Sequence, residues 1–235
     1  KDGEYVLKDI SFKASEGEKI GIIGPTGSGK SSLISLIPRL YDTTSGSVMI
    51  GNKDVRSLKI KDLRKIIGVV LQDTTLFSGS IADNLRFGME DANEEMMDSA
   101  TRDAQAFEFI NSSNEGYNRE VGQRGKNLSG GQKQRISIAR TLIKNPKILI
   151  LDDSSSALDM ETESKLQNSL KNRMKDSTVF LIAQRISAVM DSDKIIVLDN
   201  GEIAAIGTHK ELIKNCEIYR SIAISQLGEE AVLNV

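Results

Sequence analysis

The sequence has no tryptophan, a single cysteine and a single histidine, and aromatic residues make up only 4% of it. The lone Cys216 rules out an internal disulfide framework and is typical of a reducing compartment. The scarcity of aromatic side chains disfavours a protein that binds RNA or sugars by stacking. A net charge of −2 provides no basic footprint for nucleic acid. No apolar run approaches the roughly 20 residues that a membrane span needs.

A glycine-rich stretch near the N-terminus is the most informative feature that is present. It has the pattern of a phosphate loop, in which a glycine is followed by four free positions and then by Gly-Lys-Ser or Gly-Lys-Thr. The apolar run at 19–23 predicts a strand before it, and residues 32–37 predict a helix after it. We expect its residues to bind a nucleotide, and they are Gly24, Pro25, Thr26, Gly27, Ser28, Gly29, Lys30, Ser31 and Ser32.

The chemistry of such a loop follows from its backbone. Glycines let the chain adopt conformations closed to other residues and approach a ligand closely. The backbone N–H groups then form an anion-binding nest at a helix N-terminus. Lys30 is expected to reach the β- and γ-phosphates, and the Ser31 hydroxyl is expected to bind Mg²⁺.

Strands and helices alternate along the rest of the chain, which predicts a doubly wound α/β core. Continuous apolar runs are typical of parallel strands that are buried on both faces. Helical periodicity marks 91–109 and 136–143. The predicted strands, besides the one before the phosphate loop, cover residues 6–13, 48–50, 66–71, 147–151, 178–183, 194–198 and 202–207.

Further motifs follow the phosphate loop in a fixed order. An apolar strand ends in Asp152, where an acidic residue beside a phosphate loop holds Mg²⁺. A second stretch, able to bind an anion at a helix N-terminus, consists of Leu128, Ser129, Gly130, Gly131 and Gln132. With these motifs the chain resembles, over essentially its whole length, the nucleotide-binding domain of ABC transporters, in which they are the Walker B strand and the signature.

The resemblance implies a fold and a domain organisation. The fold is that of a P-loop NTPase, with a RecA-like parallel α/β core, an antiparallel β region on the N-terminal side and an inserted helical lobe. We expect the core to cover about 1–72 and 136–235, and the lobe to cover about 73–135.

The resemblance also implies cofactors and partners. ATP and Mg²⁺ are the expected cofactors, with Ser31, Gln72 and Asp152 as the expected protein ligands of the metal. Each ATP is expected to lie between one domain's phosphate loop and the signature of a second domain, in a head-to-tail dimer whose interface includes Asp159. Gln72 is expected to link the nucleotide to a membrane partner.

Two segments resemble the exporter branch of the family, namely residues 76–81 and 121–125. In exporters this surface receives the coupling helices of the transmembrane domains. The resemblance therefore implies transmembrane domains as partners, no nucleic acid, and a soluble domain at the cytoplasmic face of the cell membrane. The chain opens abruptly at Lys1, so we expect it to be part of a longer protein, with the residue that stacks on adenine lying before Lys1.

Two positions depart from the family pattern. The family usually has glutamate after the Walker B aspartate, and this chain has Asp153. Aspartate is one methylene shorter, which withdraws the carboxylate by about 1.5 Å, whereas a general base must lie within about 2.6–3.2 Å of its proton. The family usually has a histidine that contacts the γ-phosphate, and this chain has Gln184, which can donate a hydrogen bond but carries no charge.

Both departures affect hydrolysis, because Asp153 and Gln184 are the expected catalytic residues together with Gln72. The pattern resembles one half of a heterodimeric exporter, whose own site hydrolyses ATP slowly and whose signature completes a competent site on a different partner chain. One alternative is a module that binds ATP without turnover. Another is a chromosome-maintenance ATPase, but residues 32–127 lack the sustained heptads of its long coiled coil.

Overall fold

The computed structural model describes residues 5–233, which form two compact units. The first unit comprises residues 5–67, 148–152 and 177–233, and the second comprises residues 68–147 and 153–176. No helix within residues 5–233 combines the length and hydrophobicity that crossing a lipid bilayer requires. The expected division into a core and a helical lobe stays a prediction.

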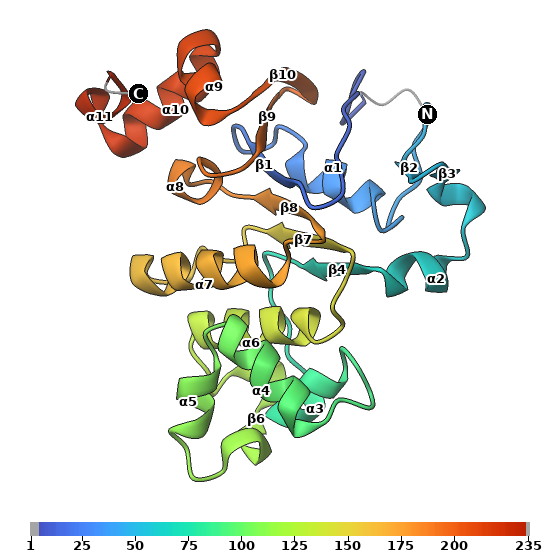
Figure 1. The fold of residues 1–235 in the computed structure, drawn as a ribbon, viewed down its shortest axis with the longest axis vertical. Helices are drawn as coiled ribbons and strands as arrows, with labels where there is room; N and C mark the ends of the chain where they lie inside the picture. The colour runs from blue at the N-terminus through green and yellow to red at the C-terminus, as the bar shows by residue number, and fades with distance from the viewer. Residues whose placement is uncertain (1–4, 234–235) are drawn as a thin grey trace. The chain divides into compact units, whose positions relative to one another are not determined.

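The first unit is built on a mostly parallel sheet (Figure 1), as the sequence predicts. The strands run in the order β10-β9-β1-β8-β7, and β4, whose first residue belongs to this unit, follows β7 at the edge. β1 is parallel to β8 and β9, β7 is parallel to β8, and only β10 is antiparallel to its neighbour. The strands are β1 (Lys19–Ile23), β4 (Ile67–Val70), β7 (Ile148–Asp152), β8 (Thr178–Ile182), β9 (Lys194–Asp199) and β10 (Glu202–Gly207).

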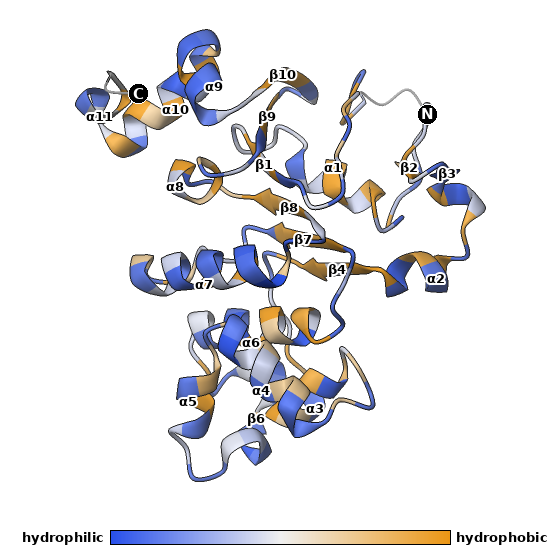
Figure 2. Cartoon of the chain, viewed as in Figure 1, coloured by the Kyte–Doolittle hydropathy of each residue, from blue (hydrophilic) through white to orange (hydrophobic). Residues whose placement is uncertain are grey.

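The central strands are the apolar runs of the sequence, and Figure 2 shows β1, β7 and β8 largely in the hydrophobic colour. In β1, Ile20 and Ile22 are completely buried, and so are Leu149 and Ile150 in β7. Burial on both faces explains why these strands read as continuous apolar runs rather than as alternating ones. The unit's helices are α1 (Lys30–Leu36), α2 (Ile60–Lys65), α8 (Ile186–Val189), α9 (His209–Asn215), α10 (Glu217–Leu227) and α11 (Glu229–Leu233).

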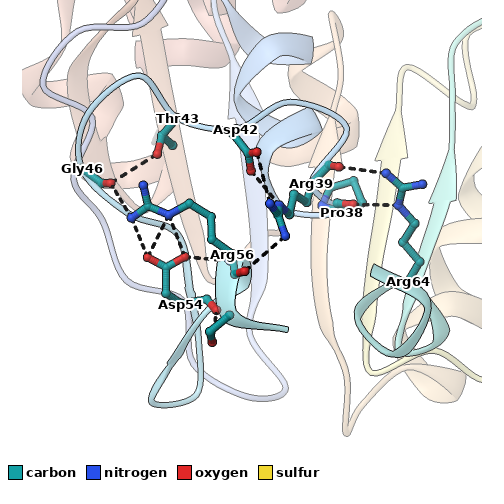
Figure 3. Close-up of polar contacts among 9 residues, drawn as sticks. Pro38, Arg39, Asp42, Thr43, Gly46, Asp54, Arg56 and Arg64 are labelled. Carbon is teal, nitrogen blue, oxygen red and sulfur yellow. Dashed lines mark hydrogen bonds and ion pairs between the residues drawn. The ribbon is translucent and has the colours of Figure 1, made fainter. Parts of the chain in front are cut away.

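The loop after α1 is joined to the small hairpin of β2 (Met49–Ile50) and β3 (Lys53–Asp54) by a cluster of arginine contacts (Figure 3). Arg39 pairs with Asp42 at 2.7 Å and also donates to the carbonyl of Arg56. Arg56 pairs with Asp54 at 2.7 Å, and Arg64 donates to backbone carbonyls of the loop. These contacts hold together the region that carries the predicted antiparallel β element.

The second unit is mainly helical, with one short two-stranded antiparallel sheet. Helix α6 packs against α3 and α4, and α4 also packs against α7. Arg173 ties α7 to this group, because its guanidinium donates to the Asp103 carboxylate and to the Leu142 carbonyl. The elements are β5 (Gly79–Ser80), α3 (Ile81–Arg86), α4 (Glu94–Asp103), α5 (Phe107–Asn111), β6 (Glu120–Val121), α6 (Gly130–Leu142) and α7 (Met160–Arg173), with 3-10 turns at Gly116–Asn118 and Gln123–Gly125.

Two predicted elements differ from the structure. The expected strand over 6–13 is wrong, since this segment is irregular; Asp9 has a φ of 48°, which interrupts an extended run. The helix expected over 91–109 is split into α4 and α5, because Gln105 has a φ of 57° between them. Periodicity alone does not reveal a single left-handed residue inside a segment.

Candidate functional site

The glycine-rich loop joins β1 to α1 at the end of the strand, as the sequence predicts. Gly24 has a φ of 154°, and a Cβ atom there would lie 1.9 Å from the Leu198 carbonyl oxygen, so no other residue fits. Gly27 has a φ of 83°, and a Cβ atom there would meet nothing within 4 Å. The first glycine is therefore required by packing, whereas the second leaves the loop open to a close ligand.

The side chain of Lys30 folds back over this loop. Its Nζ donates to the carbonyl oxygens of Gly24 at 2.9 Å and Pro25 at 2.8 Å, and lies 3.4 Å from the Ser28 hydroxyl. The ammonium group is thus held inside the curve of the loop. A phosphate oxygen carries more negative charge than a carbonyl oxygen, so a nucleotide in the loop would compete well for the same donor.

The first unit also presents oxygen ligands suited to Mg²⁺. Asp152 ends β7 opposite Ile182 and is only 6% exposed, and Ser31 lies in the first turn of α1. Among residues 5–233 no group of three or more His, Cys, Asp or Glu side chains could hold a metal ion. A hydroxyl and a single carboxylate fit Mg²⁺ that takes its other ligands from water and from nucleotide phosphates. The remaining expected ligand, Gln72, belongs to the second unit.

Gln184 follows β8 after one buried residue, Ala183, and its side chain is exposed. Its backbone carbonyl accepts a hydrogen bond of 2.7 Å from the side chain of Gln226 in α10. The first unit therefore carries the phosphate loop, Asp152 and Gln184.

Within the second unit, two of the predicted catalytic residues come together. The Gln72 Nε2 atom donates to the Asp153 carboxylate across 3.4 Å, although the residues are 81 positions apart in sequence. Asp153 has a φ of 44°, a left-handed conformation that aspartate tolerates better than most residues. The backbone therefore bends sharply directly after the end of β7.

The signature stretch starts α6, with its glycines in the first helical turn. Ser129 is the N-cap: its hydroxyl accepts from the Gln132 N–H at 3.2 Å, while the Gln132 side chain accepts from the Ser129 N–H at 3.0 Å. This capping box satisfies two backbone N–H groups at the start of the helix. A Cβ atom at Gly131 would lie 3.0 Å from the Ala157 carbonyl oxygen, so this glycine admits the loop that precedes α7.

That loop is held by Asp159 and by three side chains that the sequence analysis did not single out, those of Gln134, Ser155 and Glu163. Gln134 of α6 accepts a hydrogen bond of 3.2 Å from the Ala157 N–H, and the Ser155 hydroxyl donates to the buried Glu163. Asp159 caps α7 and accepts from the backbone N–H and the hydroxyl of Thr162 at 2.9 and 2.8 Å. These hydrogen bonds lower the pKa of Asp159. The burial of Gln134, a polar residue of helix α6, is the signal that could have pointed to its bond with this loop.

The only histidine of the sequence, His209, is packed inside the first unit. Thr208 caps α9 through a capping box, and His209 is buried behind it. Its Nδ1 atom lies 2.8 Å from the hydroxyl of the fully buried Tyr219. Burial lowers the pKa of His209.

A parallel sheet whose first strand leads through a glycine-rich loop into a helix defines a P-loop nucleotide-binding domain. A family model described as ABC transporter matches residues 7–156. The chain belongs to the ABC transporter family and is an ATP-binding domain of that family.

Two Bacillus subtilis proteins are among its relatives. YgaD, which bears the name of a multidrug export ATP-binding/permease protein, is 50% identical over 91% of this chain and 37% of its own length. YknU, named as an ABC transporter ATP-binding protein, is 44% identical over 100% of this chain and 40% of its own length. The chain thus spans well under half the length of these relatives.

The fold also matches a solved structure, that of a bacterial Atm1-family ABC exporter with ATP bound. The TM-score is 0.92 at 38% sequence identity, over 95% of this chain and 40% of the other. The likeness agrees with the predicted α/β architecture.

Proposed function

We propose that this chain is the ATP-binding and ATP-hydrolysing domain of an ABC exporter, and that its own site hydrolyses ATP slowly. The observation that carries the second part is Asp153, a short carboxylate at the position of the expected general base, within hydrogen-bonding reach of Gln72. The exporter assignment is supported by the name of YgaD and by the likeness to an exporter with ATP bound.

Two features would slow hydrolysis, namely the short side chain of Asp153 and the absence of charge on Gln184. The aspartate carboxylate is about 1.5 Å shorter in reach than that of glutamate, and proton transfer requires an approach of about 2.6–3.2 Å. Gln184 can donate one hydrogen bond to a γ-phosphate, but it contributes no positive charge as that phosphate develops negative charge. The phosphate loop and the signature keep their full patterns, so we expect ATP binding to be retained.

The signature supports a head-to-tail pairing with a second nucleotide-binding domain. Ser129 caps α6, a helix of 13 residues, and the first two residues of the helix are glycines, which carry no side chain at its positive N-terminus. The phosphate loop already binds this domain's own nucleotide, so a second anion site on the same domain is explained if it binds the nucleotide held by a partner domain. We propose that this partner is a different chain with a competent site of its own.

The transmembrane domains are the proposed partners of an apolar surface on the second unit. Phe77 and Phe87 stack with their ring centroids 4.3 Å apart and are 45% and 70% exposed. The guanidinium of Arg140 lies 5.7 Å from the Phe77 ring, and burial lowers its pKa. An exposed aromatic pair is suited to covering by a short helix. The domain would then lie at the cytoplasmic face of the membrane, with ATP and Mg²⁺ as cofactors.

The test is turnover at each site of the complete transporter. One site is silenced at a time, by replacing Asp153 with asparagine here or the corresponding acid in the partner, and single-turnover hydrolysis of ATP is measured. We expect this chain's site to be at least about tenfold slower than the partner's. Equal rates would refute the slow site, and complete loss of hydrolysis here with retained binding would favour the non-catalytic module.

A further inference from the structure

The backbone that leads from β8 into α8 passes through Gln184 and Arg185 without regular structure. Arg185 is the N-cap of α8 in an extended conformation, with φ −95° and ψ 129°, and its side chain does not cap the helix. The first N–H of α8, that of Ile186, therefore needs an acceptor from elsewhere.

Gln226 of α10 provides this acceptor and a donor at the same time. Its Oε1 atom accepts from the Ile186 N–H at 2.8 Å, and its Nε2 atom donates to the Gln184 carbonyl oxygen at 2.7 Å. A primary amide has its acceptor and donor in one plane. Because both are used, on backbone groups two residues apart, the segment is held in position and also in rotation.

Gln226 is presented by a firmly packed helix. Tyr219, Ala223 and Gln226 follow the spacing of one helix face, and the first two are completely buried. The Tyr219 hydroxyl is bonded to His209 at 2.8 Å, which joins α10 to α9. Tyr219 and Ala223 therefore anchor α10 in the first unit, and Gln226 follows Ala223 by three residues in the exposed last turn of the helix.

We propose that Gln226 is a positioning residue for the nucleotide site: by holding the backbone on both sides of Arg185, it sets where the side chain of Gln184 lies. This inference rests on the proposed function, in which Gln184 contacts the γ-phosphate. It makes the docking of helix α10 a determinant of the rate of hydrolysis.

The contact of Gln226 with the segment from Gln184 to Ile186 is tested first by a measurement that does not depend on ATP hydrolysis. In the complete transporter, hydrogen–deuterium exchange of the segment 183–190 is compared in the parent, Gln226→Leu and Gln226→Glu. Leucine removes both bonds, whereas glutamate keeps the acceptor for the Ile186 N–H. We expect faster exchange in Gln226→Leu, a smaller increase in Gln226→Glu, which loses the donor to the Gln184 carbonyl, and parent behaviour in the control Ser225→Ala on the adjacent exposed residue. Parent-like exchange in Gln226→Leu would overturn the proposal.

The positioning role is tested by single-turnover hydrolysis with the partner's site silenced. We expect Gln226→Leu to slow hydrolysis at least about fivefold, since two hydrogen bonds are lost, with MgATP affinity unchanged and Gln226→Glu intermediate. In a Gln184→Ala background the same substitution should have no further effect. Equal slowing in both backgrounds, or weaker ATP binding, would indicate a merely structural role and overturn the proposal.

The two inferences fail in different ways. If Gln184→Ala alone leaves hydrolysis unchanged, the proposed role of Gln184 fails, and the positioning role fails with it. If Gln184→Ala slows hydrolysis while Gln226→Leu does not, the proposed function stands and only the role of Gln226 is rejected.

Discussion

The side-chain amide of Gln72 donates to the carboxylate of Asp153 across 3.4 Å within the second unit. Gln72 is expected to link the nucleotide to the membrane partner, and Asp153 is expected to activate water. The bond therefore connects these two expected roles. It is a long hydrogen bond, and hydrogen bonds at catalytic positions often tighten only when substrate is bound. We infer that a movement of the segment after β4, which carries Gln72, would change the position of the Asp153 carboxylate through this hydrogen bond.

Lengthening that carboxylate should accelerate the site. We predict that Asp153→Glu combined with Gln184→His raises single-turnover hydrolysis at least several-fold when the partner's site is silenced. Loss of a positioned base costs about 10²–10⁴-fold, so even partial recovery is measurable. The gain is limited because Asp153 has a φ of 44°, which glutamate tolerates less well.

Asp153→Asn is the matched control, because asparagine keeps the size and the left-handed preference but cannot act as a base. It should hydrolyse more slowly than the parent with unchanged ATP affinity. If the double variant is no faster than the parent while the partner's signature is intact, these two residues are not the cause of the proposed slow hydrolysis.

Removing the ammonium group from the phosphate loop should weaken nucleotide binding. We predict that Lys30→Ala lowers the affinity for MgATP by about tenfold or more, since charged hydrogen bonds to phosphate are lost. Calorimetric titration measures the effect, with Lys61→Ala on the exposed surface of α2 as control. An unchanged dissociation constant would place Lys30 outside the site.

Blocking the signature should affect the partner rather than this chain. We predict that Ser129→Arg leaves ATP binding by this chain intact but reduces hydrolysis at the partner's site by about tenfold or more. Ser129→Ala is the control, because it also loses the capping bond to Gln132 but leaves the helix N-terminus open. Full activity of the assembled transporter with Ser129→Arg would refute the head-to-tail arrangement.

The buried His209 should make stability depend on pH. Burial lowers its pKa, so below about pH 6.5 the unfolded state binds a proton that the folded state does not. The free energy of unfolding should therefore fall as the pH drops from 7.5 through 6.5 towards 5.5. Urea titrations of the chain measure this slope, and His209→Gln should reduce it, because no other histidine is present. An identical slope in the variant would contradict the prediction.

The sequence predicted best those elements whose local pattern is sufficient to identify them. The buried strands β1, β7, β8 and β9 follow from continuous apolar runs, because burial on both faces removes any need for alternation. The strand expected at 6–13 was wrong, because its alternation says nothing about the φ of 48° at Asp9. A single left-handed residue arises from contacts that a local pattern does not contain.

The sequence by itself determined the chemistry of the chain: the order of its motifs, the identity of Asp153 and Gln184, and the family. Only the tertiary structure decided which of these groups meet. Gln72 and Asp153 are 81 positions apart, and Gln226 and Gln184 are 42 positions apart. A lone glutamine carries no periodic or spacing signal, and its partner is chosen by the packing of elements distant in sequence. The contacts of Gln226 with the segment from Gln184 to Ile186 therefore became visible only in the folded chain.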